Sequence, residues 1–319
     1  PPPPPPPAPP PPPPPAPPHP PPPPPARDES LGAFVRRRFG QEALEKIAEP
    51  LMGGIFVADA DRLSLKMTFP RFQEMEQKHR SLIKAMRKIV PGGSPFMTLK
   101  NGLQDLVDRL LERMPRVRIV KEAAVRVESG KVRLNGATLE ADAIILAVSA
   151  PAGARLVGEG WGEAMTRIPY VSTATVSLGY RASDVPHPLD ATGFVIPKAE
   201  GRKILACTWT SSKFEFRAPA GHVLMRVFVV GEPSDPLAVA REELKQILGV
   251  TAEPVVSRTF VWKEVNPVYE VGHEKRVGEV ESRRPPGLFL TGSAYRGVGL
   301  PDCIHDGTEV ARQVLEGSL

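Results

Sequence analysis

The chain has 319 residues, enough for about two domains with sizeable cores. Its formal net charge of +5 is small and scattered, and no basic stripe carries interleaved aromatic residues. Nucleic acid is therefore not expected as a partner. The two cysteines, Cys207 and Cys303, lie far apart without a CxxC motif, which is typical of proteins from a reducing compartment.

The sequence contains no run of about 18 apolar residues, as a transmembrane helix requires, and no signal peptide at its start. A cytoplasmic protein is therefore expected, and peripheral contact with a membrane is left open.

Every position from 1 to 25 is proline except Ala8, Ala16 and His19. Such a tract forms an extended polyproline II rod, which has no internal hydrogen bonds and cannot build a core. Residues 1–29 are therefore expected to be disordered. The origin and role of the tract stay open, because it is either a low-complexity appendage or a spacer or ligand for a proline-binding domain.

Residues 30–98 are expected to form a small helical subdomain. Ser30 predicts the N-cap of its first helix, and two further helical patterns follow. The consecutive Arg36, Arg37 and Arg38 predict either a solvated helix face or a surface for an acidic partner.

Residues 99–150 have α/β character. An amphipathic helix is expected at 101–114 and a short strand at 117–120. Asn135-Gly136 is the strongest two-residue hairpin signal. Residues 143–148 are apolar throughout, as in a strand that is covered on both faces of a parallel sheet.

Residues 151–265 have antiparallel character and predict an α+β domain, a sheet with helices packed on it. One helix is expected at Leu237–Leu248. The expected strands are residues 173–180, 193–197, 204–209, 223–230 and 255–262.

Residues 266–319 return to α/β character. An apolar run ends before Gly292, a loop with Gly297 and Gly299 follows, and then a helix begins. Glycines before a helix N-terminus let backbone approach a ligand closely and aim free N–H groups at an anion or an electron-rich ring. The residues expected to share one face of this helix are Ile304, Thr308, Ala311 and Leu315.

The sequence contains no self-contained catalytic apparatus. Its six histidines show neither HxxH nor HExxH spacing, so no metal site is predicted. A Gly-x-Ser-x-Gly elbow and a P-loop do not occur. Cys303 is interpreted as a packing residue, and a thiol of depressed pKa is the alternative. No catalytic side chain is assigned, and an enzyme without such groups takes its chemistry from a cofactor.

Several stretches carry a family resemblance. They are Ser30–Gly40, Glu49–Phe56, Gly102–Leu106, Gly193–Pro197, Cys207–Pro219, Pro267–Tyr269 with Gly272-His273, and Gly297–Ile304. Together they resemble the protoporphyrinogen oxidases, flavin enzymes of haem biosynthesis within the flavin amine-oxidase superfamily. The resemblance runs from about residue 30 to the end.

The resemblance implies noncovalent FAD and oxidation of a porphyrinogen, either protoporphyrinogen IX or coproporphyrinogen III, with oxygen as acceptor. A homodimer is left open. The cofactor-binding residues that it implies are Val125, Glu274, Gly292, Gly297, Val298, Gly299 and Leu300. The apolar walls that it implies around the macrocycle are Val195, Ile196 and Phe214.

The Gly-x-Gly-x-x-Gly turn with which this family holds the FAD pyrophosphate does not occur in the sequence, which predicts a truncated form. The expected fold is α/β plus α+β: an incomplete Rossmann-like FAD-binding domain with an inserted helical and antiparallel-sheet substrate domain. Residues 99–150 and 266–319 complete each other only if they share one sheet. FAD binding and activity without the turn stay open. The alternatives are a flavin amine oxidase relative and a non-catalytic porphyrin-binding or interaction protein.

Overall fold

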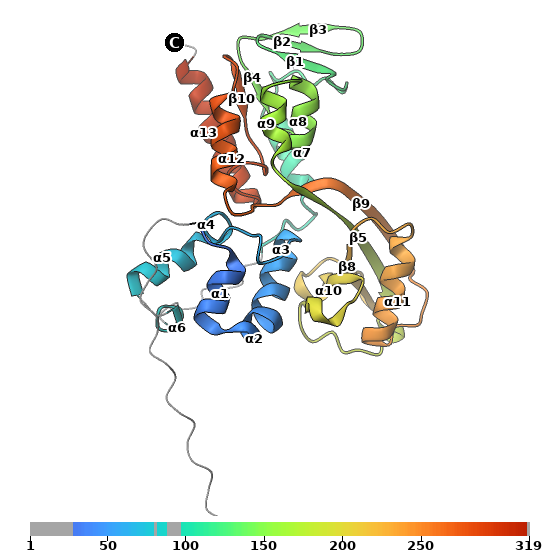
Figure 1. The fold of residues 1–319 in the computed structure, drawn as a ribbon. Helices are drawn as coiled ribbons and strands as arrows, with labels where there is room; N and C mark the ends of the chain where they lie inside the picture. Colours follow the sequence, from blue (N-terminus) through green and yellow to red (C-terminus); the bar gives the residue numbers. More distant parts are fainter. Residues whose placement is uncertain (1–27, 80–81, 88–96, 318–319) are drawn as a thin grey trace, which may run out of the picture.

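The computed structural model describes residues 28–79, 82–87 and 97–317, which form three units (Figure 1). A helical unit and an antiparallel sheet unit lie side by side, and an α/β unit lies across one end of both. The proline tract lies outside the described residues up to position 27. Asp28, which was assigned to the tract, belongs to the helical unit, because its carboxylate accepts a hydrogen bond from the Ser64 hydroxyl at 2.5 Å.

The helical unit begins where the sequence predicts. The Ser30 hydroxyl accepts a hydrogen bond from the Ala33 N–H at 3.1 Å, which confirms the N-cap. Leu31 and Leu63 are fully buried in its core. Its helices are α1 (Leu31–Phe39), α2 (Gln41–Ala43), the π-helix η1 (Leu44–Gly53), α3 (Gly54–Phe56), α4 (Leu65–Thr68), α5 (Pro70–His79) and α6 (Leu82–Met86).

The three arginines of α1 all form ion pairs within the helical unit, and they differ in exposure. Arg36 pairs with Asp61 at 2.6 Å, and Arg37 and Arg38 both pair with Glu76 of α5. The Glu76 side chain is only 3% exposed. The solvated-face interpretation therefore holds for Arg36 but is wrong for Arg38, whose side chain is 6% exposed, and the ion pairs leave none of the three cations free for an acidic partner.

Replacing Glu76 with alanine is expected to destabilise the helical unit by about 3–5 kcal/mol, because two arginine side chains then lose a buried counter-charge. Glu42→Ala is a matched control, since its ion pair with Lys46 is exposed and contributes about 0.5 kcal/mol or less. Urea unfolding measures both values. Equal costs for the two variants would show that the Glu76 pair has no special role.

The α/β unit joins segments that lie far apart in the sequence. Strands β4 and β10 pair in parallel, with Ile144 opposite Leu288, so residues 99–150 and 266–319 share one sheet as required. The Asn135-Gly136 hairpin is also confirmed between β2 and β3. The elements are α7 (Gln104–Glu112), β1 (Arg126–Glu128), β2 (Lys131–Arg133), β3 (Thr138–Glu140), β4 (Ile144–Leu146), α8 (Ala150–Val157), α9 (Trp161–Thr166), α12 (His273–Ser282), β10 (Leu288–Leu290) and α13 (Leu300–Gly317).

Three features of this unit differ from expectation. Residues 117–120 form no strand. Strand β4 is covered on one face only, because Ile144 and Leu146 are buried while Ile145 is 42% exposed. The sheet domain is expected to begin at residue 151, but the residues that follow form two helices that the sequence did not predict, α8 and α9. Their apolar side chains instead share the core of β4, β10 and α12.

The tail helix α13 turns a different face inward from the one predicted. Ile304 and Leu315, on the expected apolar face, are 56% and 72% exposed. The buried positions are Asp306 and Val310. The helical spacing of the apolar residues is confirmed, but within the described residues it does not predict which side chains of α13 are buried. One of the buried positions holds a polar residue, Asp306, which binds the preceding loop.

The sheet unit confirms all five predicted strands. Their order is β6-β7-β8-β5-β9, every neighbouring pair is antiparallel, and α11 packs on one face (Figure 1). The elements are β5 (Tyr170–Arg181), η2 (Ala182–Asp184), β6 (Gly193–Val195), η3 (Lys198–Glu200), β7 (Ile204–Trp209), α10 (Thr210–Lys213), β8 (His222–Val230), α11 (Pro236–Leu248) and β9 (Val256–Pro267).

Candidate functional site

The loop that follows β10 and ends at the first residue of α13, residues 291–300, lies where the three units meet. Val298 of this loop packs against the core of the helical unit, as does Val171 at the start of β5. Val268, directly after β9, is buried in the same cluster. The glycine loop singled out in the sequence is thus placed between the helical unit and the sheet unit.

One end of the loop is anchored by a buried carboxylate. Asp306 of α13 accepts hydrogen bonds from the Thr291 hydroxyl at 2.7 Å and from the Gly292 N–H at 3.2 Å. It also accepts one from the Arg296 guanidinium at 2.8 Å. Because Asp306 is only 6% exposed, these three donors fix both the start and the middle of the loop to the helix that follows it.

The other end is closed by a tyrosine hydroxyl. Tyr269 donates to the Ser293 carbonyl at 2.7 Å and accepts from the Gly297 N–H at 2.8 Å. The ring is 1% exposed and stacks on the His273 imidazole, with 4.0 Å between the ring centroids. A single side chain thus bridges the loop from residue 293 to residue 297.

His273 holds the Tyr269 ring in place through this stacking contact. It is fully buried, and its Nε2 donates to the Tyr295 carbonyl at 3.2 Å, since a carbonyl can only accept. Its Nδ1 has no partner among the described residues. Burial lowers the pKa of His273 to about 4, so the ring is neutral at pH 7.

This buried histidine predicts a loss of stability in acid. Below about pH 6.5 the unfolded chain binds a proton at His273 that the folded chain does not bind. The free energy of unfolding should fall by about 2.5 kcal/mol between pH 7.5 and pH 4.5 through this residue alone. His273→Gln keeps an N–H donor and should remove that part of the pH dependence in urea unfolding. The exposed His305→Gln is the control, and an unchanged pH dependence in His273→Gln would contradict the prediction.

The end of the loop presents free N–H groups at the start of α13. The Gly299 N–H donates to the Asp302 carboxylate at 3.2 Å. Among the described residues, the N–H groups of Val298 and Leu300 have no acceptor. The unpaired N–H groups and the positive end of the helix dipole favour an electron-rich group at this point.

Cys303 lies half-buried in this first turn, and its thiol donates to the Gly297 carbonyl, with 3.6 Å between sulfur and oxygen. Burial, together with Asp302 and Asp306 nearby, raises the pKa of its thiol. The alternative interpretation as a nucleophile with a depressed pKa is therefore wrong.

Two other residues assigned to the cofactor lie outside this loop. Glu274 forms an ion pair with Lys66 of α4, and its side chain is 64% exposed. Val125 stands just before β1 and is 49% exposed. Their assignment to FAD stays a prediction.

The residues assigned to the substrate are distributed over two faces of the sheet. Val195 is 38% exposed, whereas Ile196 packs against the core under α11, because neighbouring residues of a strand point to opposite faces. Ile196 also lines a cavity of about 400 Å³ between η1 and the sheet, together with Val57. Phe214 is half-buried after α10, with the Lys213 ammonium 5.5 Å from its ring centroid.

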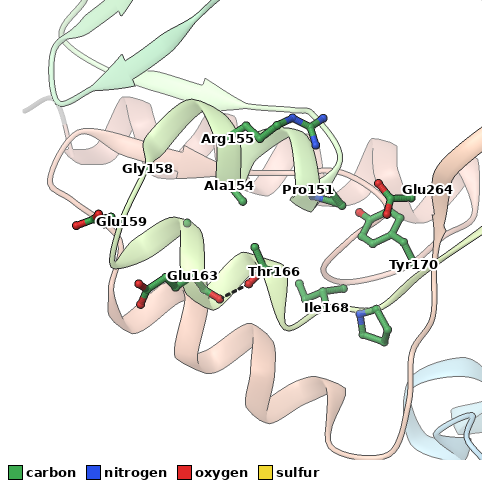
Figure 2. A pocket seen from close by; sticks show the side chains of 12 residues that line it. Pro151, Ala154, Arg155, Gly158, Glu159, Glu163, Thr166, Ile168, Tyr170 and Glu264 are labelled. Atoms are coloured by element: carbon green, nitrogen blue, oxygen red, sulfur yellow. Dashed lines mark hydrogen bonds between the residues drawn. The ribbon is translucent and has the colours of Figure 1, made fainter.

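A further cavity of about 660 Å³ lies along α8 and α9 (Figure 2). Tyr170 and Glu264 lie at one end of it and Glu159 at the other. Its lining carries three carboxylates against one guanidinium, that of Arg155. This charge balance disfavours an anionic ligand, so the cavity is a poor site for a flavin pyrophosphate or a carboxylated macrocycle.

No group of three or more His, Cys, Asp or Glu side chains within the described ranges is arranged to hold a metal ion. In the same ranges, no helix combines the length and the apolar character needed to span a bilayer.

A sequence profile described as flavin containing amine oxidoreductase matches residues 17–315. The chain belongs to this family. The coproporphyrinogen III oxidase of Bacillus subtilis is 36% identical over 317 residues, which cover 90% of this chain and 67% of that protein. Protoporphyrinogen oxidase 1 of Arabidopsis thaliana is 25% identical and is covered to 63% of its length.

Among solved structures, a putative protoporphyrinogen oxidase from Exiguobacterium superposes with a TM-score of 0.80 at 32% identity. The superposition covers 92% of this chain and 68% of that one. The chain therefore spans about two thirds of the length of its flavin-family relatives. This superposition confirms the mixed α/β fold of the family over the part of the chain that it covers.

The cofactor of this family is a flavin, and the residues of the chain fit part of FAD. The loop at 291–300 fits the ring end of a flavin, because it offers close backbone approach and unpaired N–H groups. The pyrophosphate end needs a glycine-rich turn, and Gly-x-Gly-x-x-Gly does not occur in the 319 residues. The residues of this chain thus fit one end of FAD.

Sequence reasoning missed two residues that organise the loop. Tyr269 lies in one of the stretches that carry the family resemblance, but nothing in a sequence predicts a hydroxyl that bridges a loop 24 residues away. Asp306 follows Asp302 at helical spacing and so looks like another solvated acid. Only its burial distinguishes it.

Proposed function

We propose that this chain carries the flavin-facing loop and the substrate-binding sheet of an oxidase that converts a porphyrinogen to the porphyrin in haem biosynthesis. The observation that carries the proposal is the loop held by Tyr269 and Asp306, whose free N–H groups lie at the junction of the three units. The names of the flavin-family relatives support a porphyrinogen as substrate, with coproporphyrinogen III first.

The chemistry that bound FAD supplies is repeated two-electron oxidation of the macrocycle, with the electrons passed to oxygen. The residues of this chain bind and orient. The N–H groups of Val298 and Leu300 would donate to a carbonyl of the flavin ring and stabilise negative charge there. The apolar sheet residues hold the macrocycle beside that ring and exclude water.

The proposal is tested with the purified chain and added FAD. Flavin absorbance after gel filtration reports the cofactor, and porphyrin fluorescence reports turnover of coproporphyrinogen III and protoporphyrinogen IX. We expect fluorescence to rise faster than in flavin-free and heat-denatured controls, and only when oxygen is present.

Retention of FAD without turnover of either porphyrinogen contradicts the proposal. Oxidation of an amine under the same conditions would favour a flavin amine oxidase. Porphyrin binding without any FAD binding would favour a non-catalytic porphyrin-binding protein.

A further inference from the structure

The first turn of α13 carries a carboxylate directly beside the glycine loop. Asp302 accepts a hydrogen bond from the Gly299 N–H at 3.2 Å. Gly299 stands at the N-cap of the helix and Asp302 at its third position, from which a side chain can reach back to the N-cap N–H. Of the three consecutive N–H groups at residues 298–300, Asp302 thus takes the middle one and leaves the outer two for a ligand.

The loop is folded tightly around this side chain. A Cβ added to Gly297 would lie 2.4 Å from the Asp302 Cβ, and one added to Gly299 would lie 2.8 Å from the Asp302 Oδ2. The two glycines therefore make room for a carboxylate as well as for a ligand. Packing and the hydrogen bond together fix the place of Asp302 relative to the free N–H groups.

The charge of Asp302 is not balanced, unlike that of the next acid in the helix. Asp306 pairs with the Arg296 guanidinium at 2.8 Å. Asp302 is exposed and forms no ion pair with any described residue; its hydrogen-bond partner is a backbone N–H. Its negative charge lies at the positive end of the α13 dipole, so it offsets part of the field that would stabilise an anion there.

This charge lies within reach of any ring that accepts the free N–H groups. The Asp302 Oδ2 is 3.2 Å from the Gly299 nitrogen. Neighbouring backbone nitrogens are less than about 4 Å apart, and a hydrogen bond from one of them adds about 2.9 Å. The carboxylate is therefore within about 10 Å of the accepting ring atom. At that distance and an effective dielectric constant of about 20, one unit charge changes the affinity for another about tenfold.

We propose that Asp302 lowers the reduction potential of the flavin that binds at this loop. Two electrons and one proton convert the neutral oxidised ring to a reduced ring with one negative charge. The Asp302 charge opposes the reduced ring and leaves the oxidised ring almost unaffected. This inference rests on the proposed function and deepens it, because a lower potential makes the reduced flavin a stronger electron donor to oxygen.

An acid in the first turn also stabilises the helix itself, through its dipole and through the bond to the N-cap. The reduction potential separates the two roles. An acid that only stabilised the helix would leave the potential of the bound flavin unchanged when its charge is removed without loss of the hydrogen bond.

The test uses the full chain with FAD and, separately, with lumiflavin, which is the flavin ring without the phosphate-bearing chain. Midpoint potentials of the bound flavins are measured without oxygen against reference dyes. Asp302→Asn keeps an oxygen for the Gly299 N–H and removes the charge. It should favour reduced over oxidised flavin about tenfold more than the unchanged chain does, which raises the two-electron potential by about 30 mV. Asp302→Glu keeps the charge and should change this ratio less than twofold.

Glu309→Gln is the matched control. It removes one exposed negative charge from the same helix, about 10 Å further from the loop, where Glu309 pairs with Arg312. This variant should change the ratio less than twofold. Thermal unfolding of the flavin-free chains shows whether Asp302→Asn leaves the helix intact.

An unchanged potential in Asp302→Asn overturns the inference, and so does an equal rise in Glu309→Gln or a failure of both flavins to bind. The potentials are measured without a porphyrinogen, so the inference and the proposed function can fail separately. A raised potential in a chain that oxidises neither porphyrinogen would keep the inference and contradict the oxidase proposal. Turnover of a porphyrinogen with the potential unchanged in Asp302→Asn would do the reverse.

Discussion

Replacing Gly297 with alanine is expected to reduce the affinity of the chain for FAD about 100-fold or more. A Cβ at this position would lie 2.4 Å from the Asp302 Cβ and 2.7 Å from its Cγ. The Asp302 Cβ is fixed by the backbone of the first turn of α13, so no change of rotamer relieves its contact. The φ of Gly297 is +153°, which an L-residue rarely adopts. Strain and overpacking each cost about 1–3 kcal/mol, so the loop must leave its place.

Gly278→Ala is the matched control for this glycine replacement. Gly278 lies within α12, and no heavy atom stands within 4 Å of the Cβ that alanine would add. This variant should be neutral or slightly stabilising, by up to about 1 kcal/mol. FAD titration followed by flavin absorbance, together with thermal unfolding of the flavin-free chain, measures both. A Gly297→Ala chain that binds FAD like the unchanged protein would remove the loop from the proposed site.

Periodicity and residue type were enough to predict the sheet unit. Strand β5 carries Ala174, Val176 and Leu178 on one face, and all three are fully buried, because α11 of the same chain covers them. Where both partners of an apolar face lie close in sequence, the pattern and the burial agree. The pairing of β4 with β10 was predictable on a different ground. Residues 99–150 and 266–319 both have α/β character, and they complete each other only if they share one sheet.

Periodicity failed where an apolar face has no partner among the described residues. Helix α7 is amphipathic as predicted, yet it has no buried residue, and Val107 is 47% exposed. Ile145 of β4 and Ile304 of α13 are open in the same way. A hydrophobic pattern identifies an apolar face whose burial would stabilise the fold. Only the structure shows whether other described residues pack against that face.

The candidate site was predictable only in its glycines. Gly292 and Gly297 mark the loop in the sequence, because both have backbone conformations that favour glycine. The side chains that hold the loop, Tyr269 and Asp306, come from a distant segment and from a helix face that seemed solvated. Their roles depend on burial and on hydrogen-bond geometry, neither of which a linear pattern contains.

Removing the hydroxyl of Tyr269 is expected to loosen the loop without disturbing the packing around it. In Tyr269→Phe the Ser293 carbonyl and the Gly297 N–H each lose a buried partner, at about 1–3 kcal/mol for each group. The phenyl ring can still stack on His273, so the apolar packing around it is kept. Amide exchange of the peptide that spans residues 291–300 should therefore accelerate about 30-fold or more in the flavin-free chain.

The same replacement should weaken FAD binding by a similar factor, because the free N–H groups at the start of α13 are then no longer held in one orientation. Tyr180→Phe is the control, since Tyr180 is equally buried in the sheet core and its hydroxyl has no hydrogen bond within the described residues. Faster exchange in both variants would indicate a general loss of stability. Faster exchange in Tyr269→Phe with unchanged FAD affinity would show that the loop is ordered by Tyr269 but does not contact the flavin. Tyr269 is a positioning residue for the cofactor if Tyr269→Phe shows both faster exchange and weaker FAD binding while Tyr180→Phe changes neither.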